Sequence, residues 1–162
     1  MDKFLELAEQ VIIYQIRTGW LEMSRLFNEI AATHGITAAI GLTLLTINPE
    51  KGTPVTKIAP RMGMEPNSLS RLLNSLEDKG LIFRRPSQSD KRRVYICLTE
   101  AGQEKRKVAY NVVFGLHHEF SKDITPEKLE AFFEVMSVIR KKVETLKEDT
   151  DRIIFKDPTI KS

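Results

Sequence analysis

The amino-acid sequence predicts a mainly α-helical fold with one small β-hairpin. Apolar residues recur at helical spacings through both the N-terminal and the C-terminal parts of the chain. The pattern changes once to the alternation of a strand, at residues 93–98, directly after a polar, basic stretch. The length of 162 residues, with 41% hydrophobic and 29% charged residues, suits one globular domain. We therefore expect residues 1–162 to form a single domain.

Residues 4–32 are predicted to form one long helix. Further apolar residues widen its apolar stripe beyond one narrow face, so the helix is expected to pack on more than one side. Gly35 is placed to end it. The apolar positions at spacings of three, four or seven are Leu5, Ile12, Ile16, Trp20, Met23, Phe27 and Ile30.

A second helix is expected at 37–47, with Thr37 as its N-terminal cap. The polar residues 48–52, which include a proline and a glycine, predict a turn, and 53–55 a short extended piece.

A third helix is expected at 57–63, capped by Thr56 and closed by Gly63. Pro60 lies inside it and should shorten or kink it. A fourth helix, 66–79, begins with a proline and ends at a glycine. Its core face consists of Leu69, Leu72, Leu73 and Leu76.

Residues 81–85 and 93–98 are predicted to be the two strands of a hairpin, joined by the turn-like residues 86–92. A fifth helix, 100–121, follows the cap Thr99. A sixth helix starts at Thr125–Glu127 and carries a long apolar stripe. The tail, 149–162, either docks or stays mobile.

Three short helices followed by a hairpin make a winged helix-turn-helix, here placed at 37–99. The tight turn 63–65 is short enough to hold the third and fourth helices at the required angle. The start of the fourth helix can then meet base edges in the DNA major groove. The residues expected to do so are Asn67, Ser68, Ser70 and Arg71, because Asn suits adenine, Arg suits guanine and Ser suits either base or phosphate.

The hairpin loop offers a second DNA contact. Lys91, Arg92 and Arg93 lie at or beside its tip, where cations can reach phosphate or a narrow minor groove. Asp90 is expected to orient Arg92 by pairing with its planar guanidinium. Residues 57–93 hold nine basic and four acidic side chains, whereas the rest of the chain holds 16 basic and 18 acidic ones. Positive charge therefore gathers in the middle of the chain, as in nucleic-acid binders.

The stretch 56–102 resembles the MarR (multiple antibiotic resistance regulator) family of transcription regulators. The resemblance is carried by 68–73 (SLSRLL), 76–82 (LEDKGLI), 90–93 (DKRR) and 98–102 (LTEAG), in this order and spacing. It implies a wing whose Arg92 enters the minor groove with Asp90 as its partner, and it extends over residues 5–146. Pro66 and Asn67 depart from the residues that the family often has there, so the DNA sequence read is left open.

The resemblance also implies a homodimer built from the first, fifth and sixth helices, in segments 1–35 and 100–148. The sequence supports this independently, because helices 4–32 and 127–147 are too apolar and too long for a small winged domain to cover. A two-fold dimer predicts a pseudo-palindromic operator on double-stranded DNA. Family members are mostly repressors, and many are released by a small phenolic or anionic effector.

Other functions find less support in the sequence. No phosphate loop, nucleophile elbow, HExxH motif or carboxylate pair indicates an enzyme. A winged module that binds another protein is the alternative; it would more often expose apolar residues where this chain has polar and basic ones. His34, His117 and His118 are expected to bind no metal, Cys97 is expected not to sense oxidants, and Trp20 is a possible effector contact. A single cysteine and no predicted leader or membrane span favour the cytoplasm.

Overall fold

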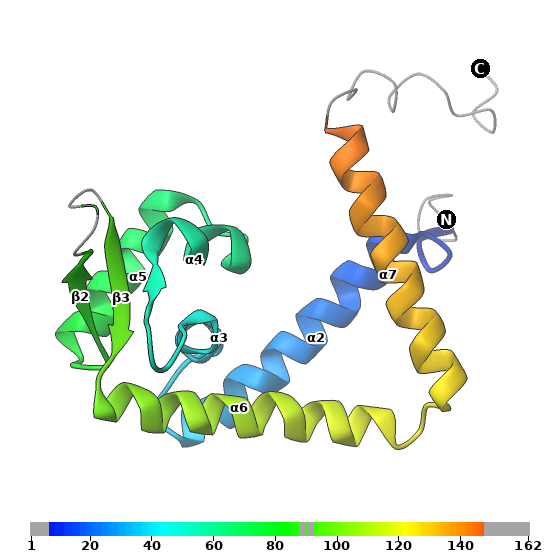
Figure 1. The fold of residues 1–162 in the computed structure, drawn as a ribbon. Helices are drawn as coiled ribbons and strands as arrows, with labels where there is room; N and C mark the ends of the chain where they lie inside the picture. The colour runs from blue at the N-terminus through cyan, green and yellow to red at the C-terminus, as the bar shows by residue number, and fades with distance from the viewer. Residues whose placement is uncertain (1–6, 88–89, 91–92, 148–162) are drawn as a thin grey trace. The chain divides into compact units, whose positions relative to one another are not determined.

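The computed structural model describes residues 7–87, 90 and 93–147, which fall into two compact units, Met1–Leu116 and His117–Ser162. The first unit holds a mainly helical lobe with a small sheet, as the sequence predicts (Figure 1). Its elements, in chain order, are α2 (Ile12–Thr33), α3 (Ala38–Thr46), β1 (Thr53–Pro54), α4 (Val55–Met62), α5 (Pro66–Asp78), β2 (Ile82–Pro86), β3 (Val94–Leu98) and most of α6 (Glu100–Ser121).

The prediction of one uninterrupted helix at 4–32 is wrong. Helical residues Leu7 and Ala8 are separated from α2 by a turn, and Val11 has an extended backbone. The amide of Val11 donates to the carbonyl of Ala8 at 3.0 Å, and the side chain of Gln15 donates to the carbonyl of Glu9 at 2.6 Å. A side-chain amide thus occupies a carbonyl that a continuous helix would bond through its backbone. Gly35, with φ 70°, follows the end of α2 as predicted.

The helix α3 lies between α2 and α6, and a glycine makes this packing possible. A β-carbon at Gly41 would be 3.1 Å from the β-carbon of Ala109 and 3.7 Å from the ring of Phe27. The predicted cap is confirmed, because the hydroxyl of Thr37 accepts from the amide of Ile40 at 3.2 Å. This close packing fixes the position of α3, against which α4 packs.

The start of α4 differs from its prediction. Thr56 is inside the helix and Pro54 is the residue before it, because the short strand β1 runs straight into α4 without a polar cap. Pro60 lies inside α4, which ends two residues later, at Met62. Gly63, with φ 58°, closes α4 as expected.

The sheet has three antiparallel strands in the order β1-β3-β2. The hairpin β2–β3 was predicted, and the register pairs Ile82 with Leu98 and Pro86 with Val94. The extended piece at 53–55 adds a third strand, since Thr53 pairs with Ile96. Strand β3 is therefore central, and Ile96, Cys97 and Leu98 are buried in it.

The core of the first unit joins the short helices to the sheet. Its largest completely buried side chains come from α3 and the residue after it, from α4 and α5, and from the strands, so these elements share one apolar centre. The largest of them are Leu44, Ile47, Ile58, Leu69, Leu73, Leu76, Ile82 and Ile96.

The second unit contains the end of α6 and α7 (Pro126–Leu146). Thr125 caps α7 as predicted, by accepting from the amide of Lys128 at 3.5 Å. No residue of α7 is buried. Within the part of the chain that the structure describes, no single helix is long and apolar enough to cross a membrane; the pair α2 and α3, bent by 88°, meets that test only together.

Candidate nucleic-acid interface

Helix α5 presents two contrasting faces, and the sequence spacing accounts for both. Leu69, Leu73 and Leu76 are buried, since they recur at the helical period and point to the core. The predicted base-contacting residues Asn67, Ser68, Ser70 and Arg71 are all exposed near the start of the same helix. Their polar atoms are therefore free of the core and open to a partner.

The turn between α4 and α5 sets the position of this exposed end. Gly63 adopts the left-handed conformation, and the amide of Met64 donates to the carbonyl of Ala59 at 3.2 Å. Pro66 then starts α5, where its missing amide hydrogen costs nothing. Two helices joined in this way match the helix-turn-helix that the sequence predicts.

The loop of the wing, described only in part, contains a local network. The side chains of Arg93 and Asp90 form an ion pair at 3.3 Å, and the amide of Ser87 donates to the carbonyl of Arg93 at 2.9 Å. Lys91 and Arg92 lie outside the described residues, so the predicted pairing of Asp90 with Arg92 stays a prediction. Arg93 is exposed, as a DNA contact must be.

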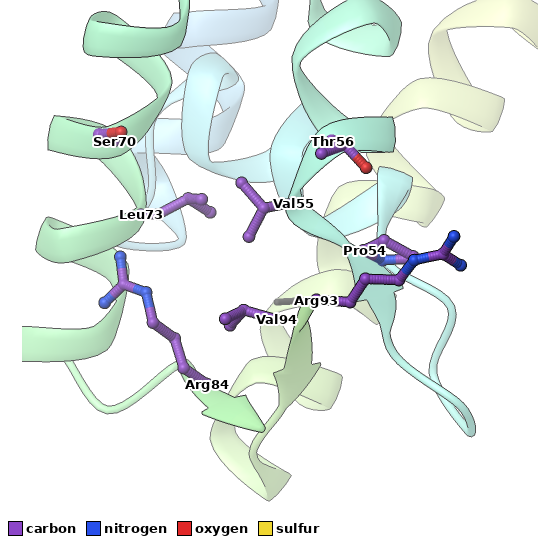
Figure 2. A pocket seen from close by; sticks show the side chains of 8 residues that line it. All are labelled: Pro54, Val55, Thr56, Ser70, Leu73, Arg84, Arg93 and Val94. Carbon is purple, nitrogen blue, oxygen red and sulfur yellow. The ribbon is translucent and has the colours of Figure 1, made fainter. Parts of the chain in front are cut away.

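A cavity of about 320 Å³ separates α5 from the wing (Figure 2). Ser70 and Leu73 line it from α5, and Arg84, Arg93 and Val94 line it from the hairpin. Figure 2 shows the guanidinium groups of Arg84 and Arg93 directed to opposite sides, with that of Arg84 turned toward α5. The two predicted DNA-binding elements therefore flank a common hollow.

Two arginines behave differently from what their charge suggested. Arg84 donates to Asn74 Oδ1 at 2.7 Å and also bonds Glu77, both on α5. Arg85 donates to the carbonyl of Lys51 at 2.8 Å. By their positions in the sequence, both arginines count toward the positive charge of residues 57–93. No pattern in the sequence alone would have paired β2 with these acceptors, because the pairing depends on how the strand lies against α5.

The surroundings of the histidines and of Cys97 bear on metal binding and on oxidant sensing. Among residues 7–87, 90 and 93–147, no group of three or more His, Cys, Asp or Glu side chains is arranged to hold a metal ion. Cys97 is 6% exposed and lies under the turn at Gly52, which withdraws it from reagents in solution.

Residues 36–94, which contain α3, β1, α4, α5 and β2, match the model of the MarR family. A curated relative, the HTH-type transcriptional regulator SarZ of Staphylococcus epidermidis, is 25% identical over 113 residues, which cover 70% of this chain and 75% of SarZ.

Solved structures agree with this match. A cysteine-to-serine mutant of MarR from E. coli, complexed with operator DNA, is similar with a TM-score of 0.73 and 25% identity, covering 86% of this chain and 99% of that one. The fold is shared also with CouR from Rhodococcus jostii RHA1 bound to p-coumaroyl-CoA, at a TM-score of 0.72, 21% identity and coverage of 82% and 93%. In the sequence of its helix-turn-helix segment and in its fold, the chain thus resembles the MarR family of transcription regulators.

Proposed function

We propose that the protein is a homodimeric repressor that binds a pseudo-palindromic operator and is released by a small effector. The observation that carries the DNA-binding part is the exposed, polar start of α5 opposite a buried leucine face. In this proposal Asn67, Ser68, Ser70 and Arg71 contact base edges in the major groove. A module for protein partners would more often expose apolar residues there, which disfavours that alternative.

The wing would supply the second contact. Lys91, Arg92 and Arg93 are assigned to phosphates or to the minor groove beside the major-groove site. Asp90 is assigned to orienting the wing arginines, and its ion pair with Arg93 supports a role of this kind. Together the helix and the wing would fix the register of one protomer on one half-site.

Dimerisation is proposed through segments 1–35 and 100–148, around a winged region at 37–99. In the first unit, α2 exposes several large apolar side chains, among them Ile13 at 76% and Trp20 at 54%. In the second unit, α7 exposes Phe132, Val138 and others, with none of its residues buried. Apolar area of this extent on two helices is typical of a face that a partner covers.

The effector is proposed only by its chemical class. CouR, which shares the fold, has been crystallised with p-coumaroyl-CoA, and we extend from it only that a small phenolic or anionic molecule releases the DNA. Its binding would change the separation of the two recognition helices, because that separation must match the half-site spacing.

The test is a salt series of binding titrations with DNA from upstream of the protein's own gene and with scrambled DNA, after selection from random DNA if the upstream region is not bound. The wild type should prefer the specific site and lose affinity steeply with salt. Arg92→Ala should weaken binding and make the salt slope shallower by about 1. The matched variant Arg140→Ala, on α7 and outside the proposed DNA contacts, should leave the salt slope unchanged. Equal, weak binding to every sequence by the wild type would overturn the proposal.

A further inference from the structure

Arg84 joins the recognition helix to the wing. It lies on β2, and its guanidinium donates to Asn74 Oδ1 at 2.7 Å and to the carboxylate of Glu77. Both acceptors belong to the second half of α5. The Arg84 and Glu77 side chains are only about one third exposed, at 34% and 37%, so water screens this ion pair less than one at a fully exposed surface.

The chemistry of this contact allows Arg84 to orient helix α5 relative to strand β2, in addition to attracting it. Asn74 and Glu77 are three residues apart and therefore lie on the same face of the helix. The planar guanidinium can donate from two nitrogens at once, so it fixes both the distance and the direction of the helix relative to the strand. A lysine, with one flexible ammonium, could not hold both acceptors in the same geometry.

The contact lies where a small rotation has a large effect. Asn74 is seven residues from Asn67, which at 1.5 Å per residue is about 10 Å along the helix. A rotation of about 10° around Asn74 would therefore move Asn67 by roughly 2 Å. Recognition geometry has to be held to about 0.5 Å, so an unrestrained helix would lose its base contacts.

A second bond holds the other side of the same strand. Arg85, the neighbour of Arg84, donates to the carbonyl of Lys51 at 2.8 Å, in the turn before β1. Strand β2 is thus attached to α5 by one arginine and to the turn by the next, because successive side chains of a strand point to opposite faces. The wing therefore provides a fixed support against which Arg84 can hold α5.

We propose that Arg84 is a positioning residue, which couples the recognition helix to the wing so that both read DNA in a single register. The inference rests on the proposed function and adds to it a determinant of specificity that makes no contact with a base. The alternative role for Arg84, contact with a DNA phosphate, predicts a different response when Glu77 is removed.

The two roles give results of opposite sign. Glu77 places a negative charge beside the surface that we assign to DNA, so its removal should strengthen binding to any DNA if charge alone matters. If Glu77 holds Arg84 in place, its removal should weaken binding to the specific site while binding to scrambled DNA stays the same or rises. The measured quantity is therefore the ratio of the two dissociation constants.

The experiment compares Glu77→Ala with Asp78→Ala. Asp78 is the exposed neighbour of Glu77, so its replacement removes the same charge but no bond to Arg84. Both proteins are titrated with the selected operator and with scrambled DNA, and thermal denaturation verifies that they fold. We expect the specificity ratio to fall about tenfold in Glu77→Ala, as for a lost hydrogen bond to a charged group. The ratio of Asp78→Ala should stay at the wild-type value. Asn74→Ala is a milder second variant, which should lower the ratio by a smaller factor.

Arg84→Ala completes the test. It should lower the ratio with an unchanged salt slope, and the double variant Glu77→Ala/Arg84→Ala should be no worse than the stronger single one. A salt slope reduced by about 1 would identify a phosphate contact and overturn the inference. Equal ratios for Glu77→Ala and Asp78→Ala would also overturn it. A wild type without any sequence preference would instead overturn the proposed function, and the inference with it.

Discussion

The backbone of Gly102 lies directly against the carbonyl group of Leu81: a β-carbon built on the glycine would be 1.9 Å from that carbonyl oxygen. The same oxygen accepts from the amide of Thr99 at 3.1 Å. The first turn of α6 is therefore pressed onto the residue that precedes β2. This contact determines where the wing leaves the body of the protein.

Gly102→Ala should destabilise the fold, because the added methyl group meets backbone, which cannot rotate away. We expect a loss of at least about 1–3 kcal/mol in the free energy of unfolding, measured by chemical denaturation. Gly115→Ala, in the same helix, meets nothing within 4 Å and should instead stabilise by roughly 0.5–1 kcal/mol. Unchanged stability of Gly102→Ala would contradict the close contact.

Thr99 should be a second determinant of the wing's base. Its hydroxyl donates to the carbonyl of Gly80 at 2.6 Å and accepts from the amide of Gly102 at 3.0 Å. Thr99→Ala removes both bonds and should cost about 1–2 kcal/mol in denaturation experiments. Thr99→Ser keeps the hydroxyl, so its loss should be clearly smaller; equal losses would show that the hydroxyl is not what matters.

Arg71→Ala should weaken binding to the selected operator by about 1–3 kcal/mol, and it should relax the preference at one base pair. The reason is that an exposed arginine at the start of α5 can bond two acceptors of guanine. Titration against operators altered one base pair at a time measures both effects. If all operators weaken to the same extent, Arg71 contacts phosphate and not a base.

The homodimer can be tested on α7. Val138 is 66% exposed in the single chain, so Val138→Glu should leave the protomer folded while placing a charge in the proposed interface. Analytical ultracentrifugation should then find monomers, and affinity for the two-half-site operator should fall. Arg140→Glu, also exposed on α7, is the matched control for the added acid. A dimeric Val138→Glu would exclude this part of α7 from the interface.

Much of the fold was predictable because its signals are local. Thr37, Gly63 and Thr99 act as helix caps or terminators at the predicted positions, and the helix 100–121 matches α6 at both ends. These residues act through their own backbone conformation or through bonds to amides two or three residues away. Such effects are contained in a short stretch of sequence.

The errors arose where the decisive contact is distant or involves a competing side chain. The apolar spacing continues across residues 9–11, whereas in the structure the helix is broken there by an extended Val11 and by the bond from Gln15 to Glu9. The exposed polar end of α5 could be predicted from its leucine spacing, whereas the bonds of Arg84 and Arg85 join residues that are seven to 34 positions apart. Neither the periodicity nor the charge count carries information about such pairs.

The turn over Cys97 makes the chain's single thiol an internal reporter. A β-carbon at Gly52 would be 2.6 Å from the Cys97 sulfur, so no alkylating reagent reaches the thiol until the turn lifts. Because the sequence holds one cysteine, labelling adds a single mass increment to each chain. When the turn closes faster than the thiol reacts, the labelling rate relative to that of an unprotected thiol gives the free energy of the local unfolding. The same turn contains the Lys51 carbonyl that accepts from Arg85 on β2. The labelling rate, measured with and without DNA, therefore also reports on the stability of the contact between this turn and the wing.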